Sequence, residues 1–172
     1  REIKFGVDIS DLNSKDFDLF LFLDYGSLIN FSTKKRGTFS LPQGTEIINI
    51  DHHYTNELFG TKNYIDSIQP SECSLLIDFF KINKVEFDKE LANRLLIGVC
   101  TDSGFFIYDT NSEKALKDAV FLIDNGADYM NIALKPILYS QPLRIKKYFA
   151  YLIDNVKFVK DEEFGYCLIP YS

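Results

Sequence analysis

Two mostly apolar runs in the first third of the chain predict strands of a sheet. Residues 19–23 read Leu-Phe-Leu-Phe-Leu without interruption, and residues 46–50 read Glu-Ile-Ile-Asn-Ile. Continuous apolar runs of this length are typical of parallel strands that are buried on both faces. The segment over residues 55–66 shows no such pattern and is expected to be irregular.

Helical spacing of apolar residues begins after residue 70. Ser71, Asp88 and Ser112 each stand before such a stretch and predict helix N-caps. Further helices are expected over residues 128–138 and 142–154, and a hairpin is expected to end the chain. The predicted apolar faces are Leu75, Leu76, Phe79 and Phe80 in the first helix, Leu91, Leu95, Leu96 and Val99 in the second, and Leu116, Val120 and Ile123 in the third.

This succession of strands and helices predicts an α/β fold: a doubly wound, mainly parallel sheet flanked by helices. Residues 1–139 are expected to form this domain. Residues 140–155 are expected to form a connecting helix, and residues 156–172 the start of a second domain.

Polar residues that bind metals stand where apolar runs end. Asp24 follows the first run, Asp51-His52-His53 follows the second, and Asp102 follows a third run over residues 95–101. Ligands of open α/β sheets bind at the carboxyl edge of the strands. We therefore expect Asp24, His52 and Asp102 to converge at one such edge. The alternatives are that Asp24 is a turn residue and Asp102 ends a helix.

The residue types at these positions favour a divalent cation. Imidazole nitrogen and carboxylate oxygen suit Mn²⁺, Zn²⁺, Fe or Mg²⁺, and the absence of clustered thiolates disfavours structural zinc. Two such ions can clamp a phosphoryl group and activate water. Side chains alternate along extended backbone, so His52 and His53 are expected to point in opposite directions, one to metal and one to substrate.

Composition narrows the class of protein. The 172 residues are 46% hydrophobic with a net charge of −6. This charge argues against a broad nucleic-acid-binding surface but leaves room for a short oligonucleotide. The three cysteines are far apart and have no C-x-x-C spacing, which is typical of reduced core residues in a cytoplasmic protein. No apolar stretch reaches membrane-spanning length, so no membrane partner is expected.

Three motifs together resemble the DHH phosphoesterase family. They are Asp24, Asp51-His52-His53 with Asn56 beyond it, and residues 101–106, which read Thr-Asp-Ser-Gly-Phe-Phe. Within that family the chain is most similar to the branch of nanoRNases (oligoribonucleases) and 3′-phosphoadenosine-5′-phosphate (pAp) phosphatases. The resemblance implies a Mn²⁺-dependent hydrolase, with Mg²⁺ or another divalent ion as the alternative, acting on short oligonucleotides or nucleotide phosphates. The oligomeric state is left open, with a homodimer as one alternative.

The resemblance also implies a role for each residue. Asp24 would bridge two metals, and His52 and Asp102 would bind one of them. His53 would lie near the scissile phosphate as a catalytic and substrate-binding residue. Asp51 would orient an imidazole and so act in catalysis. Asn56 would bind substrate, with a loop or capping role as its alternative.

The family also carries a His-x-x-x-Asp-x-Asp strand and a C-terminal substrate domain with a Gly-Gly-Gly-His segment, and this sequence contains neither motif. We therefore expect the chain to be a fragment that lacks the first metal-binding motif and is inactive alone. A catalytically degenerate DHH-fold binding or regulatory domain is the other explanation. A cyclic dinucleotide phosphodiesterase or a single-strand exonuclease of the same family remains a further alternative.

Overall fold

The computed structural model describes residues 17–28, 44–108, 111–139, 141–159 and 163–169. The chain divides into two compact units, Arg1–Asp128 and Tyr129–Ser172. Each unit is described by itself below. The predicted division of domains at residue 139 stays a prediction.

Three parallel strands form the sheet of the first unit, in the order β1 (Leu19–Leu23), β2 (Glu46–Asp51) and β3 (Lys62–Ile65). Leu23 pairs with Ile50, and Asp51 pairs with Ile65. This register brings the residues that follow β1 and β2 to the same edge. The predicted α/β class with a parallel sheet is confirmed, but β3 lies in the segment that was expected to be irregular.

β1 is not buried on both faces by the described residues, which corrects the expectation for residues 19–23. Phe22 is buried, whereas Leu19, Leu21 and Leu23 are about half exposed. In contrast, the central strand β2 buries four of its six residues. The difference arises because β1 is an edge strand of the described sheet and the described elements cover only one of its faces.

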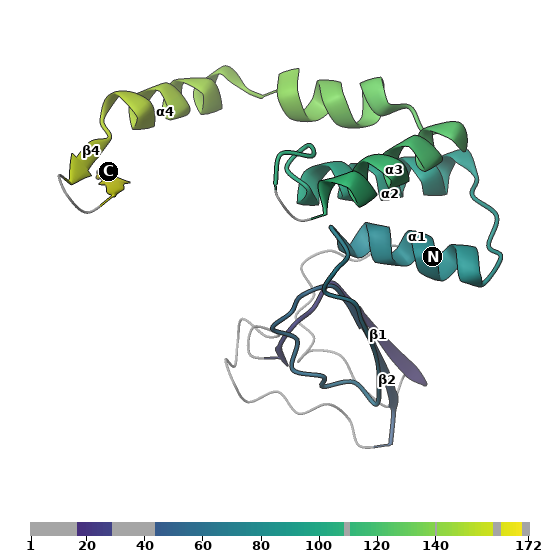
Figure 1. Cartoon of the computed structure of the whole chain (residues 1–172). Helices are drawn as coiled ribbons and strands as arrows, with labels where there is room; N and C mark the ends of the chain where they lie inside the picture. Colours follow the sequence, from purple (N-terminus) through teal and green to yellow (C-terminus); the bar gives the residue numbers. More distant parts are fainter. Residues whose placement is uncertain (1–16, 29–43, 109–110, 140, 160–162, 170–172) are drawn as a thin grey trace. The chain divides into compact units, whose positions relative to one another are not determined.

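Three helices pack on one another: α1 (Glu72–Ile82), α2 (Lys89–Asp102) and α3 (Ser112–Asp124), of which α1 lies next to β2 of the sheet (Figure 1). The predicted caps of α1 and α2 are confirmed. The Ser71 hydroxyl accepts from the Ser74 amide at 3.0 Å, and the Asp88 carboxylate accepts from the Leu91 amide at 2.8 Å. Ser112 is instead the first helical residue of α3, and Asn111 precedes it in a left-handed conformation without a capping bond. The predicted Ser112 cap is therefore wrong.

The core of the first unit lies between these helices and β2. Leu75, Leu95, Leu96 and Val99 are buried as predicted. The predicted face of α3 is wrong, because Leu116, Val120 and Ile123 are exposed. The buried apolar residues of α3 are instead Ala115, Ala119 and Leu122, and α3 packs mainly against α2.

The close approach of α1 and α2 depends on Gly98. A Cβ added at this position would overlap the Sγ of Cys73 and lie 3.1 Å from the Cβ of Cys73. Gly98 therefore allows the close packing of α2 against α1. The surrounding helix positions Leu96, Val99 and Cys100 are all fully buried.

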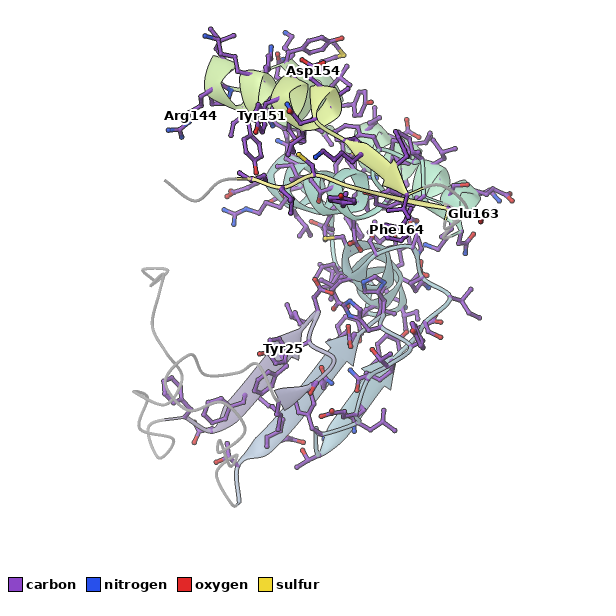
Figure 2. All side chains as sticks on the ribbon, turned by 90° about the vertical axis from the view of Figure 1, so that its left-hand side faces the viewer. Tyr25, Arg144, Tyr151, Asp154, Glu163 and Phe164 are labelled. Carbon is purple, nitrogen blue, oxygen red and sulfur yellow. The ribbon has the colours of Figure 1, made fainter. Side chains whose placement is uncertain are left out.

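The second unit contains a π-helix over Tyr129–Tyr139, the helix α4 (Leu143–Asp154), and an antiparallel pair of strands, β4 (Lys157–Val159) and β5 (Phe164–Tyr166). The two predicted helices and the predicted terminal hairpin are all present. No described residue of α4 is buried. Figure 2 shows the side chains of Arg144 and Tyr151 standing out from this helix. None of the described helices combines the length and the hydrophobicity needed to cross a membrane.

We expect Gly98→Ala to lower the free energy of unfolding. The overlap with Cys73 should cost about 1–3 kcal/mol. This exceeds the gain in helix propensity, which is at most about 1 kcal/mol. Urea denaturation of the single variants Gly98→Ala and Cys73→Ala and of the double variant would measure the coupling. The double variant should lose less than the sum of the two single losses. A Gly98→Ala chain as stable as wild type would contradict this packing.

Candidate metal centre

Asp24 leaves β1 in a strained conformation that directs its carboxylate to the end of β2. Its φ is 60°, in the left-handed region, which is uncommon for residues other than glycine. Its amide donates to the carbonyl of Ile50 at 3.1 Å, so the turn is attached to β2. Strain of this kind persists where the surrounding structure imposes it, and it is frequent at functional sites. The carboxylate is about half exposed.

Asp51 ends β2 and is completely buried. Its Oδ1 accepts from His53 Nδ1 at 2.7 Å and from the His52 amide at 2.9 Å. Its Oδ2 accepts from the side chain of Asn56 at 2.5 Å. Burial acts to raise the pKa of Asp51. The hydrogen bonds from Asn56 and His53, with the charge of His53, outweigh burial, so the pKa is lowered and the carboxylate stays ionised.

Asn56 connects this carboxylate to both neighbouring loops. Its Nδ2 also donates to the carbonyl of Tyr25 at 3.2 Å, beside Asp24. Its Oδ1 accepts from the Leu58 amide at 2.8 Å and from Asn49 at 3.3 Å. Both ends of the amide are thus engaged within the protein, which gives Asn56 a positioning role. A substrate contact at Asn56 stays a prediction.

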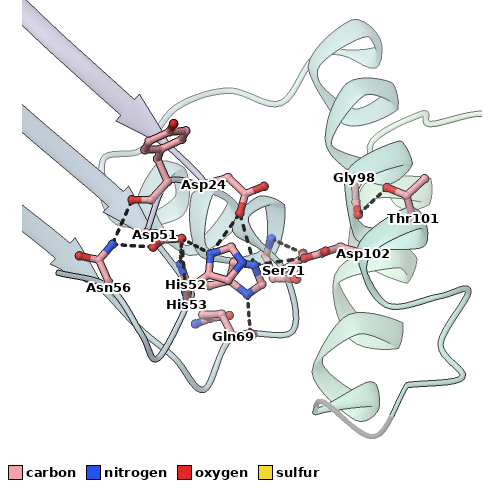
Figure 3. A network of polar contacts seen from close by, with 12 residues as sticks. Asp24, Asp51, His52, His53, Asn56, Gln69, Ser71, Gly98, Thr101 and Asp102 are labelled. Carbon is pink, nitrogen blue, oxygen red and sulfur yellow. Dashed lines mark hydrogen bonds and ion pairs between the residues drawn. The ribbon is translucent and has the colours of Figure 1, made fainter. Parts of the chain in front are cut away.

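His52 occupies the centre of the cluster, between Asp24 and Asp102 (Figure 3). Its Nε2 lies 3.5 Å from Asp24 Oδ1 and 3.3 Å from Asp102 Oδ2. Its Nδ1 lies 3.3 Å from the carbonyl of Gln69. Donation of an Nδ1 proton to that carbonyl leaves the Nε2 lone pair free, which is the usual arrangement of a metal-binding histidine.

His53 lies beside His52 and not opposite to it. The two ring centroids are 4.7 Å apart. The expected alternation fails because β2 ends at Asp51, so the two histidines lie on irregular backbone. The hydrogen bond to Asp51 raises the pKa of His53, and the charges of Asp51, Asp24 and Asp102 add to this against the effect of burial. His53 is half exposed and therefore accessible to a substrate.

Asp102 reaches the cluster from a helix, because it is the last residue of α2. The apolar run over residues 95–101 was treated as equivalent to the two strands that precede Asp24 and Asp51. This is wrong, because the run is part of the helix α2. Burial raises the pKa of Asp102, as does the charge of Asp24, while His52 and His53 lower it. Gly104, Phe105 and Phe106 then form three consecutive left-handed residues. Such a turn is costly for side chains larger than glycine.

Glu72, the first residue of α1, belongs to the same cluster and was not predicted. It is buried, and neither oxygen has a hydrogen-bond partner among the described residues. Burial raises its pKa to about 8, with contributions from the charges of Asp24, Asp51 and Asp102. In the sequence it reads as an ordinary acidic residue in a first helical turn. The only signal was its place directly after the predicted cap, Ser71.

The donor atoms fit a divalent cation. Two groups of three side chains each bring one ligand atom apiece within 4.8 Å of the others: Asp24, His52 and His53, and Asp24, Asp51 and Glu72. Asp24 belongs to both groups, which suits a bridging carboxylate. Asp102 lies beside His52 but in neither group. Imidazole nitrogen and carboxylate oxygen are ligands that Mn²⁺ and similar ions accept. The orphaned oxygens of Glu72 provide an independent sign that a cation fits here.

A cavity of about 470 Å³ opens next to the cluster. Its lining combines His52, His53 and Asp102 with an apolar and aromatic wall. The remaining lining residues are Tyr54, Ser67, Ile68, Gln69, Pro70, Tyr108 and Asn111. A Cβ on Gly104 would lie only 2.6–2.8 Å from ring atoms of Tyr108. The left-handed turn after Asp102 therefore places the Tyr108 ring at this cavity.

Comparison with curated proteins gives relatives at modest sequence identity. No family model matches the chain. It is 28% identical over 118 residues to a probable bifunctional oligoribonuclease and PAP phosphatase NrnA of Streptococcus mutans, covering 69% of this chain and 37% of that protein. It is 32% identical over 80 residues to the bifunctional oligoribonuclease and PAP phosphatase NrnA of Thermus thermophilus, covering 46% and 25%. The chain thus spans between a quarter and about a third of these relatives.

The fold resembles that of an exopolyphosphatase-related protein from Bacteroides fragilis. The TM-score is 0.74 at 21% sequence identity, over 86% of this chain and 43% of that one. This likeness concerns the fold alone. Together with the NrnA-type relatives, it confirms the resemblance to DHH phosphoesterases that the sequence motifs indicated.

We expect Asn56→Ala to destabilise the chain by about 1–3 kcal/mol, because it removes the hydrogen bond to Oδ2 of the buried Asp51 carboxylate and the acceptor of the Leu58 amide. Asn63→Ala is the matched control. Its amide braces the same loop through Gly60 and Leu58 but does not contact Asp51. Chemical denaturation should show the larger loss for Asn56→Ala. Equal losses would mean that the contact with Asp51 is not important for stability.

Proposed function

We propose that this DHH-family chain forms part of a metal-dependent phosphoesterase that hydrolyses short oligonucleotides or nucleotide phosphates. One observation supports this proposal above all others. His52 Nε2 lies between the carboxylates of Asp24 and Asp102, while His53 stands beside it with Nδ1 held by the buried Asp51. This arrangement supports a role for Asp24, His52 and Asp102 as metal ligands, with His53 as a separate acid–base group.

We propose Mn²⁺ as the native cofactor, with Mg²⁺ as the alternative. Asp24, the Nε2 of His52 and Asp102 would hold it, since both carboxylates lie next to that nitrogen. Divalent ions at such sites lower the pKa of water and offset the negative charge of phosphoryl oxygens. Asp24 is accessible enough to reach a bound ion, since its carboxylate is about half exposed.

The protein's own residues then orient the reaction. Asp51 accepts the Nδ1 proton of His53, which fixes the ring and stabilises its protonated form. A protonated His53 can contact a phosphate oxygen or deliver its Nε2 proton to the leaving oxygen. Asn56 holds Asp51 from the other side, so the direction of the His53 ring depends on both residues.

The adjoining cavity suits a nucleoside. Tyr108, Ile68 and Pro70 supply an aromatic and apolar wall next to His52 and His53. Tyr108 offers a ring on which a base can stack, an interaction that tolerates any base. A cavity of about 470 Å³ has room for a small ligand and not for a long strand. The net charge of −6 likewise favours short substrates over extended nucleic acid.

The test is hydrolysis of 5′-labelled di- to pentanucleotides and of pAp, in the presence of Mn²⁺, by the phosphoesterase of which this chain is proposed to form part. We expect Asp24→Ala to abolish turnover because it removes a ligand that both candidate cation positions share. We expect His53→Ala to lower turnover about a hundredfold or more while the metal content is retained, because it removes an acid–base group.

Asp124→Ala is the control, since Asp124 is an exposed carboxylate at the end of α3. It should leave turnover and metal content unchanged. Turnover that survives Asp24→Ala would show that the site has been assigned wrongly. Loss of metal in His53→Ala would show that His53 is a ligand and not an acid–base group.

A further inference from the structure

Gln69 contacts the ring of His52 through its backbone. Its carbonyl oxygen lies 3.3 Å from His52 Nδ1 (Figure 3). A hydrogen bond at one ring nitrogen sets the role of the other, so this carbonyl leaves Nε2 to face the carboxylates of Asp24 and Asp102. The position of a single loop carbonyl therefore controls the direction of the His52 imidazole.

The loop that carries this carbonyl is attached at both ends. The Asp66 amide donates to the carbonyl of Asp51 at 3.1 Å, and the Gln69 amide donates to the carbonyl of Asp66 at 3.2 Å. The Ile68 amide donates to the Asp66 carboxylate at 3.1 Å. The Ile68 carbonyl accepts from the side chain of Asn111 at 3.2 Å. The loop is thus held to the end of β2 and to the residue that precedes α3.

The side chain of Gln69 provides a further attachment. Its Nε2 donates to Asp66 Oδ2 and to Asp78 Oδ2, each at 3.0 Å. Ionised carboxylates only accept hydrogen bonds, so the amide can face them with its nitrogen alone. Its Oε1 is then buried without a partner among the described residues. A buried acceptor without a donor is unfavourable, which indicates that the two carboxylates impose this orientation.

A lysine on α3 holds the second of these carboxylates. Lys114 Nζ lies 3.3 Å from Asp78 Oδ1 on α1 and 2.7 Å from Asp118 Oδ2, one helical turn along α3. Asp118 is almost completely buried. Within the described part of the chain, no other lysine or arginine pairs with Asp78 or Asp118. One ammonium group therefore serves both carboxylates and connects α1 and α3 to the amide of Gln69.

We propose that Gln69 is a positioning residue for His52, and that Asp78 and Lys114 hold Gln69 in place from two helices. The network acts through one carbonyl, which fixes the imidazole and so prepares Nε2 to bind a cation. Removing the outer partner of a metal-binding histidine typically weakens metal binding about 10–100-fold. The inference rests on the proposed function only in so far as His52 binds a metal.

The first measurement needs no metal. In the 172-residue chain labelled with ¹⁵N-histidine, wild type should show an Nδ1 proton on His52 that is protected from exchange with solvent. Gln69→Ala keeps the carbonyl but removes the contacts with both carboxylates. We expect the His52 proton to exchange about tenfold faster or more, because the loop opens more often. The Nδ1 proton of His53, bound to Asp51, should be unchanged and serves as an internal reference.

A second pair of variants tests the contribution of α3. Lys114→Met should speed exchange of the His52 proton in the same direction but by less than Gln69→Ala. Lys117→Met is the matched control, because Lys117 stands on the same helix but pairs with the exposed Glu113. It should leave the His52 proton unchanged. If Lys114→Met does not fold, Gln69→Ala decides alone, since it leaves the pair of Lys114 and Asp118 intact.

Metal affinity gives a readout that a purely structural role would not produce. Calorimetric titration with Mn²⁺ should show an affinity about tenfold lower in Gln69→Ala than in wild type. In a chain that already carries His52→Gln, the same substitution should have no further effect. An equal loss in both backgrounds would show that Gln69 supports the fold alone and would overturn the inference. So would a His52 proton that is absent in wild type or unchanged in Gln69→Ala.

The outcome can be separated from that of the proposed function. If His52→Gln binds Mn²⁺ as tightly as wild type, the proposed function loses a ligand. A His52 proton that responds to Gln69→Ala still supports the positioning role in that case. Mn²⁺ binding that depends on His52, together with a His52 proton that ignores Gln69→Ala, supports the proposed function and contradicts this inference.

Discussion

A carboxylate with no exposed surface must obtain all of its stabilisation from the protein, and Asp51 is such a group. Its partners all follow it in the chain: the amide of His52, the ring of His53 and the side chain of Asn56. Asn56 then reaches the carbonyl of Tyr25, beside Asp24. The buried charge therefore fixes the loops after β1 and β2 together. The direction of His53 and the place of Asp24 both depend on it.

Strain and charge repulsion accumulate around this centre. Asp24 has a left-handed backbone, and the three residues after Ser103 form a left-handed turn. Burial raises the pKa of Glu72, and the charges of Asp24, Asp51 and Asp102 add to this effect. The chain tolerates these unfavourable features at one edge of its sheet, next to a cavity. Bound cations would balance the charge of these carboxylates and of an anionic substrate, which is why we propose phosphoester hydrolysis for this site.

The sequence predicted β1 and β2, two of the three helix caps, and the convergence of the Asp24, His52 and Asp102 side chains, because each of these residues or elements has a local signal. β3 escaped prediction because its four residues, Lys62–Ile65, carry little apolar pattern and pair through the backbone. The packed stripe of α3 was missed because alanines, not the larger apolar residues, face α2. Glu72 was missed because its burial arises only from tertiary packing.

The most direct test of the account is whether His52 binds the metal through its imidazole. The chain contains only two histidines, so ¹⁵N-histidine labelling followed by pulsed electron paramagnetic resonance of bound Mn²⁺ reports on them alone. We predict a hyperfine coupling to an imidazole nitrogen that disappears in His52→Gln and persists in His53→Gln. Absence of nitrogen coupling in wild type, or its loss only in His53→Gln, would contradict the account.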